Sequence, residues 1–187
     1  MLDEILAYIG ENGLGELSLR PLARALGTST YTLTYQFGSK DELVVAAVEH
    51  ALERQFGIIE DWVNADPDVT PVRLVRLYWD WLRDDANLRL VRMLVEGVTL
   101  ARSQPELFGV AANTFVGQWT DVLSGRFRRA GLSEQSAAAL ATQTHAMLLG
   151  LQLDLMATGD WGRLEPALEE LCLTVGAATG RPAVEAN

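Results

Sequence analysis

Residues 18–43 constrain this chain more than any other stretch, because they prescribe a short helix, a tight turn and a second helix. Ser18 suits the N-cap of the first helix, where its hydroxyl can accept a hydrogen bond from a free backbone N–H. Gly27 suits the end of that helix, because glycine adopts the left-handed conformation at little cost. Between them one apolar face recurs at helical spacing, on Leu19, Leu22, Ala23 and Leu26.

The second helix of this stretch begins at Ser29 or Thr30. Its apolar anchors, Leu33 and Phe37, stand four residues apart and therefore share one face. After a glycine, Ser39 caps a third and much longer helix. Two short helices joined by a tight turn form a helix-turn-helix, whose second helix enters the major groove of DNA.

The stretch resembles the N-terminal domain of the tetracycline-repressor (TetR) family of one-component regulators. Residues 2–13 look like the first helix of that family, residues 18–23 like the start of its second, and residues 27–29 like its turn. The chain also resembles the end of the family's third helix and the start of its fourth, at Thr32, Leu33, Phe37, Ser39, Lys40 and Leu43. The resemblance covers roughly the first 50 residues. Beyond them it rests on length and an all-helical pattern.

The resemblance implies which side chains meet DNA. Thr30, Tyr31 and Tyr35 are expected to face the bases, and Tyr31 replaces the usual glycine of the family. Thr34 stands where the family usually has a tyrosine, and Gln36 stands where it usually has a histidine or a tyrosine. These two replacements imply weaker anchoring on phosphates. The full set expected at the DNA is Ser18, Arg20, Ser29, Thr30, Tyr31, Thr34, Tyr35, Gln36 and Lys40.

Composition excludes several classes of protein. The apolar fraction of 49% excludes a disordered chain. No apolar run approaches the ~20 residues of a transmembrane helix, and the acidic start lacks the basic region of a signal peptide. The single cysteine, Cys172, excludes an internal disulfide, and its apolar helical neighbours favour a buried thiol over a redox sensor. We expect a cytoplasmic protein without a membrane segment, metal or cofactor.

The net charge of −10 is unusual for a DNA-binding protein. Residues 1–50 hold three basic side chains, Arg20, Arg24 and Lys40, against seven acidic ones. Such a domain lacks the basic footprint that usually marks nucleic-acid binding. Affinity should therefore come from two copies of these cations and from backbone N–H groups at helix N-termini, so DNA binding should require a dimer.

The rest of the chain predicts only helices. Pro67 and Pro105 mark breaks, the pair Thr70-Pro71 opens a helix, and Ser133 caps another. We expect an all-α fold of about nine helices, TetR-like, with a helix-turn-helix domain at 1–45 and a ligand-binding and dimerisation domain at 46–187. The later helices are expected at about 39–64, from 70, and at 87–100, 106–130, 134–158 and 163–178, with a frayed tail from residue 180.

An aromatic face along residues 108–122 has two readings, bundle core or the wall of an effector pocket. Aromatic walls with a few polar groups suit apolar or aromatic small molecules. The histidine in the set could be a satisfied core residue or could contact the ligand. The candidate pocket comprises Tyr78, Trp81, Met93, Phe115, Trp119, His145, Met147 and Leu148.

The last two helices carry a candidate dimer face. Small residues in one register let helix backbones approach closely, either within one chain or between two. In the TetR family these helices pair with their two-fold mates, and a helix-turn-helix that reads two half-sites needs such a dimer. The residues are Gln143, Ala146, Gly150, Leu153, Leu164, Leu168, Leu171 and Val175.

Three functions follow from these patterns. The leading hypothesis is a ligand-responsive repressor that a small apolar or aromatic effector releases from a palindromic double-stranded operator. The alternative is a TetR-fold protein-interaction module that has lost specific DNA binding, which the acidic reader, the missing basic arm, Thr34 and Gln36 favour. The arm that the family has before its first helix is either absent here or was lost in assigning the start codon. An enzyme is not expected, because the chain shows no nucleophile motif, and the segment GLGELS lacks the end of a phosphate-binding loop.

Overall fold

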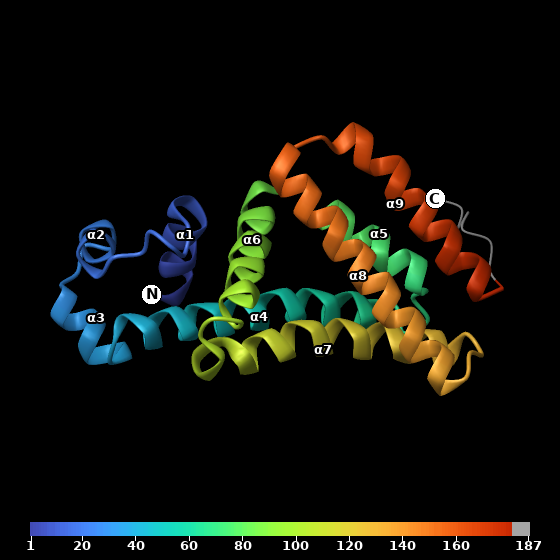
Figure 1. Cartoon of the computed structure of the whole chain (residues 1–187), viewed down its shortest axis with the longest axis horizontal. Coiled ribbons are helices and arrows are strands. Elements are labelled where there is room, and N and C mark those ends of the chain that lie inside the picture. Colours follow the sequence, from blue (N-terminus) through green and yellow to red (C-terminus); the bar gives the residue numbers. More distant parts are fainter. Residues whose placement is uncertain (181–187) are drawn as a thin grey trace. The chain divides into compact units, whose positions relative to one another are not determined.

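The computed structural model describes residues 1–180, so the tail expected to fray lies outside the described residues except for Gly180. Over the described residues the chain is all-α, as predicted, with nine helices and no strand (Figure 1). The helices are α1 (Leu2–Asn12), α2 (Leu19–Ala25), α3 (Thr30–Phe37), α4 (Lys40–Ala65), α5 (Pro71–Trp81), α6 (Asp85–Leu100), α7 (Pro105–Arg129), α8 (Glu134–Thr158) and α9 (Trp161–Ala178).

Hydroxyl groups cap several of the helices that the sequence predicted. The Oγ of Ser39 accepts the N–H of Glu42 at 3.1 Å at the start of α4. Thr70 does the same for α5, where the N–H of Arg73 donates to Oγ1 at 3.1 Å. Ser133 accepts the N–H of Ser136 at 3.2 Å and so caps α8. Each bond satisfies one of the N–H groups that a helix start leaves without an intrahelical partner.

Two helices begin two residues earlier than the sequence indicated. The carboxylate of Asp84 accepts the N–H of Ala86 at 2.7 Å, so α6 begins at Asp85. The carboxylate of Asp160 accepts the N–H of Arg163 at 3.1 Å, and α9 begins directly after it. Aspartate caps a helix as well as serine does.

The helices form two compact units, which differ from the predicted division at residue 45. The first unit joins Met1–Ile58 to Trp81–Phe115, and α1 packs on α6 within it. Its core holds fully buried side chains from α1, α2, α3 and α4, including Ile5, Leu22, Leu33 and Leu43. The predicted division at residue 45 separates the expected DNA-binding part from the expected ligand-binding and dimerisation part. It does not coincide with the boundary of a packed unit, and it stays a prediction.

The second unit comprises Ile59–Asp80 and the chain from Val116 onward. Within it α8 packs on α9 (Figure 1). The guanidinium of Arg76 on α5 binds both carboxylate oxygens of Glu169 on α9, at 3.3 and 2.6 Å. A bidentate pair of this kind fixes orientation as well as distance, so it holds α9 against α5. No helix among the described residues is long and apolar enough to cross a membrane.

Candidate DNA-reading and effector sites

The turn before α3 is built by backbone bonds around Gly27. The N–H of Thr28 donates to the carbonyl of Ala23 at 2.9 Å, and the N–H of Gly27 donates to that of Arg24 at 3.3 Å. This pair of bonds is a Schellman motif, and Gly27 takes the left-handed φ of 62° that the motif needs. Ser18 occupies the N-cap of α2, but its side chain makes no capping bond, so that part of the prediction is wrong.

Ser29 caps the start of α3, and the helix begins at Thr30, one of the two predicted starts. Its Oγ accepts the N–H of Thr32 at 3.0 Å and lies 2.9 Å from the Oγ1 of Thr32. The hydroxyl of Thr34 donates within the helix, to the carbonyl oxygens of Thr30 and Tyr31 at 3.0 and 3.1 Å. The hydroxyls of Ser29 and Thr34 are therefore already used to shape the helix.

Two tyrosines dominate the outer face of α3. Tyr31 is 75% exposed and Tyr35 is 82% exposed. Their rings stack with centroids 6.2 Å apart and planes 23° apart. The opposite face is anchored by Leu33, which is completely buried. The helix therefore presents an aromatic pair to its surroundings and buries Leu33 on its other side.

Few cations accompany this face. Arg20 on α2, Arg24 on α2 and Lys40 at the start of α4 are all exposed. Lys40 is followed by two acidic residues in the first turn of α4, Asp41 and Glu42. The remaining members of the expected set, Ser18, Ser29, Thr30 and Gln36, are exposed as well, and only Thr34 is half-buried.

The second unit contains a buried aromatic cluster. Tyr78 meets Trp119 edge-on with centroids 4.7 Å apart and an interplanar angle of 77°. Trp119 in turn stacks on the imidazole of His145, with centroids 6.5 Å apart and planes 14° apart. Trp79 contacts Trp161 edge-on at 5.4 Å. Such pairs are typical of well-packed aromatic cores.

Polar groups lie within this apolar surrounding. Burial lowers the pKa of His145, because the charged imidazolium would be poorly solvated there. His145 is therefore neutral at pH 7. Gln152 lies two turns further along the same buried face of α8. Among the described residues, the Oε1 of Gln152 and the Nε1 of Trp79 are buried without a hydrogen-bond partner. An acceptor and a donor left open in a core are groups that a ligand could satisfy.

The structure distributes the predicted effector residues unevenly. Tyr78, Trp119, His145 and Leu148 are buried in the second unit, whereas Trp81, Met93 and Phe115 belong to the first. Met147 is 49% exposed. Its side chain lies outside the core, and its assignment to a pocket wall stays a prediction. Trp79 was missed, although its place beside Tyr78 on an aromatic helix was a usable signal.

The candidate dimer face also divides into two sets. The four residues on α8, Gln143, Ala146, Gly150 and Leu153, are all exposed. The four on α9 are buried in the chain's own core, because the apolar stripe of α9 packs inward. These four, Leu164, Leu168, Leu171 and Val175, are therefore unavailable to a partner. The outer side of α9 instead exposes Ala167, Leu173 and Ala177.

Cys172 lies among these core residues of α9 and is completely buried, as predicted. Burial raises the pKa of its thiol to about 11, and the nearby Arg76 opposes this rise only in part. A thiol with so high a pKa is almost entirely protonated at pH 7. It is therefore a poor nucleophile and suits the structural role that its sequence context indicated.

The exposed tyrosine-bearing α3, set behind a Schellman turn on a helical body, defines a helix-turn-helix protein of the all-α class. Residues 1–47 match the model of the bacterial regulatory proteins of the tetR family. The N-terminal domain of this chain belongs to that family, which confirms the resemblance seen in the sequence. A search of curated proteins found no significant relative.

Solved structures share the whole fold. A transcriptional regulator from Rhodococcus sp. Rha1 superposes with a TM-score of 0.80 at 20% identity, over 99% of this chain and 97% of that one. A TetR transcriptional regulator from Legionella pneumophila gives 0.73 at 20% identity, over 92% and 94%. The multidrug binding protein EbrR, complexed with imidazole, gives 0.64 at 22% identity, over 91% of each chain. Over the described residues the chain therefore has the fold of TetR transcriptional regulators.

Proposed function

We propose that this protein is a ligand-responsive repressor that acts in the cytoplasm, binds a palindromic operator as a homodimer and is released by a small apolar or aromatic effector. The observation that carries the proposal is the face of α3, where Tyr31 and Tyr35 stand exposed and stacked. Large aromatic side chains held in water have no packing role in one chain, so they suit contact with a partner surface.

The chemistry of α3 suits the major groove of DNA. A tyrosine ring can contact the methyl group of thymine, and its hydroxyl can donate to a phosphate or a base acceptor. Thr30 and Gln36 are exposed beside the pair and can add hydrogen bonds. Ser29 and Thr34 use their hydroxyls within the helix, so they would support the reader more than they would bind phosphate.

Phosphate contacts would fall to Arg20, Arg24 and Lys40, each supplied twice by a dimer. For the dimer we propose the exposed side of α8, from Gln143 to Leu153, together with the outer side of α9. Leu153 is 47% exposed and Leu173 on α9 is 49% exposed. Two exposed leucines and several small residues form the kind of apolar surface that partner helices cover.

The effector would bind at the aromatic cluster of the second unit. The open Oε1 of Gln152 can accept a hydrogen bond, and the open Nε1 of Trp79 can donate one. Both α4 and α7 continue from one unit into the other, so a ligand that reshapes the second unit can change the pose of α4 and the spacing of the two readers. The effector can change the free energy of operator binding only by as much as its own binding free energy differs between the two arrangements.

A titration of the purified protein against DNA from directly upstream of its own gene tests the proposal, at low and at moderate salt. We expect a salt-sensitive complex of two chains per site that protects a palindrome. Tyr35→Ala should abolish the complex, whereas Lys40→Ala should weaken it and reduce the salt slope by about two for a dimer. Arg73→Ala, an exposed change on α5, is the control.

A folded, dimeric protein without a specific complex would instead favour the alternative, a protein-interaction module on the same fold. The acidic N-terminal region is the observation that favours this second function. The Tyr31–Tyr35 pair would then be a contact for protein rather than for DNA.

A further inference from the structure

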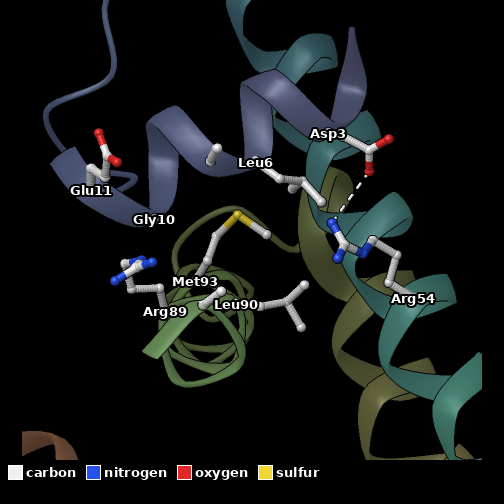
Figure 2. Close-up of a pocket in the computed structure, with 10 residues that line it drawn as sticks. Asp3, Leu6, Gly10, Glu11, Arg54, Arg89, Leu90 and Met93 are labelled. Atoms are coloured by element: carbon white, nitrogen blue, oxygen red, sulfur yellow. Dashed lines mark hydrogen bonds and ion pairs between the residues drawn. The ribbon is translucent and has the colours of Figure 1, made fainter. Parts of the chain in front are cut away.

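A hollow opens between α1 and α6 within the first unit (Figure 2). Its volume is about 120 Å³, and a second hollow of about 200 Å³ adjoins it at Gly10, Glu11, Arg89 and Met93. An apolar cavity of roughly 150 Å³ holds a molecule as large as benzene. Together, the two adjoining hollows are therefore large enough for a small organic ligand.

The floor of this hollow is apolar. Leu6 on α1 and Leu90 and Met93 on α6 lie in the space between the two helices (Figure 2). Gly10 keeps the helices close, since a Cβ there would lie 3.2 Å from the Cβ of Arg89. A branched or thioether side chain of a ligand would pack against these apolar side chains.

Charged side chains stand at both ends of the hollow, but only at one end are they paired with groups of the chain itself. At the first end the carboxylate of Asp3 binds the Nη1 of Arg54 at 3.3 Å and the Nε2 of His50 at 3.0 Å. Glu96, at the neighbouring hollow, accepts the N–H of Leu14 at 3.0 Å. Asp3 and Glu96 are therefore occupied by partners within the chain.

At the other end Arg89 and Glu11 both line the hollow (Figure 2). Within residues 1–180 neither side chain forms an ion pair or a hydrogen bond, with each other or with any other group. A carboxylate of a ligand would pair with the half-buried guanidinium of Arg89. Glu11 would repel that carboxylate unless the same ligand also carried a positive charge.

From this balance of charges we infer that the α1–α6 hollow is a second ligand site, which binds a small zwitterion with an apolar tail, an apolar α-amino acid. The carboxylate of the ligand pairs with Arg89, its ammonium pairs with Glu11, and its side chain lies on Leu6, Leu90 and Met93. The site is separate from the proposed effector core in the second unit.

Titration of the full chain with L-leucine tests this inference, by calorimetry and by ¹⁵N NMR of the backbone signals of Gly10 and Met93. The two comparison probes are 3-methylbutylamine, which lacks the carboxylate, and 4-methylpentanoate, which lacks the ammonium. We expect L-leucine to bind and to shift both signals, and each comparison probe to bind about ten- to a hundredfold more weakly. No DNA is present, so this result does not depend on the proposed repressor function.

Three variants assign the binding to the hollow. Arg89→Gln and Glu11→Gln should each weaken L-leucine binding by about tenfold or more. Ala7→Leu fills the hollow from the exposed side of α1 without removing a charge, and it should abolish binding while the Tm stays unchanged. Arg73→Gln on α5 is the matched control and should bind like the unaltered chain.

Either of two results would overturn the site. The first is no heat and no signal shift with L-leucine at about 10 mM, since affinity weaker than that is not specific recognition. The second is binding that Ala7→Leu leaves intact, which would place the ligand elsewhere. Equal binding of L-leucine and 4-methylpentanoate would overturn the zwitterion assignment, because Glu11 would then have no role.

Discussion

The reading helix α3 and the aromatic cluster of the second unit use large aromatic side chains in opposite ways. Tyr31 and Tyr35 stack on each other in water, four residues apart on one short helix. Tyr78, Trp119 and His145 come from three different helices, contact one another through their rings and are buried. The first arrangement depends on local backbone geometry, and the second depends on packing between segments far apart in sequence. The same residue types are therefore exposed on a short helix in one region and buried in the core in the other.

Removing one ring from each region should show the largest contrast. Trp119→Ala removes the contacts with Tyr78 and His145 and leaves a cavity, so it should lower the free energy of unfolding by about 3–5 kcal/mol. Tyr35→Ala removes an exposed ring and should change it by less than about 0.5 kcal/mol. Urea unfolding followed by circular dichroism measures both. A larger loss for Tyr35→Ala than for Trp119→Ala would contradict the comparison.

The reading region should instead be sensitive to its backbone at Gly38. This residue has φ of 85°, and a Cβ there would collide with the carboxylate of Glu42. Gly38→Ala should therefore destabilise the chain by about 1–2 kcal/mol. Gly109→Ala, in the interior of α7 with open space around it, should stabilise it by about 0.5–1 kcal/mol. Thermal unfolding compares the two variants, and equal Tm values would refute the role of Gly38.

The smallest effects on the free energy of unfolding are expected at the helix caps. Losing a capping hydroxyl should cost the same in both regions. Ser29→Ala and Ser133→Ala each remove a hydroxyl that caps a helix, and each should cost about 1 kcal/mol. Ser18→Ala removes a hydroxyl that makes no capping bond and should cost less than about 0.5 kcal/mol. Chemical denaturation of the three variants measures the series. A cost for Ser18→Ala equal to that for Ser29→Ala would mean that Ser18 caps α2 in solution.

The sequence predicted the reading region well because its signals act over a few residues. The left-handed Gly27 and the start of α3 at Ser29 or Thr30 were both foreseen, since each depends on neighbours within the same turn. The resemblance to the TetR family could be quoted residue by residue there, and the family match covers the same residues.

The second unit was harder to predict because helical periodicity finds an apolar face without saying what covers it. The stripe from Leu164 to Val175 could face a partner or the core, and α5 and α8 turned out to belong to the same packed unit. α8 carries apolar residues nearly all round, so Met147 could not be told from its buried neighbours. The open pair of groups on Trp79 and Gln152 arises only from three-dimensional packing.

The scarcity of cations around α3 would also affect how such a regulator searches genomic DNA for its operator. Arg20, Arg24 and Lys40 are its only basic side chains in the first 50 residues, so bulk DNA would hold it weakly. Little of the protein would then be sequestered on the millions of competing sites. Most molecules would diffuse freely between encounters, and a small copy number would suffice to keep one operator occupied.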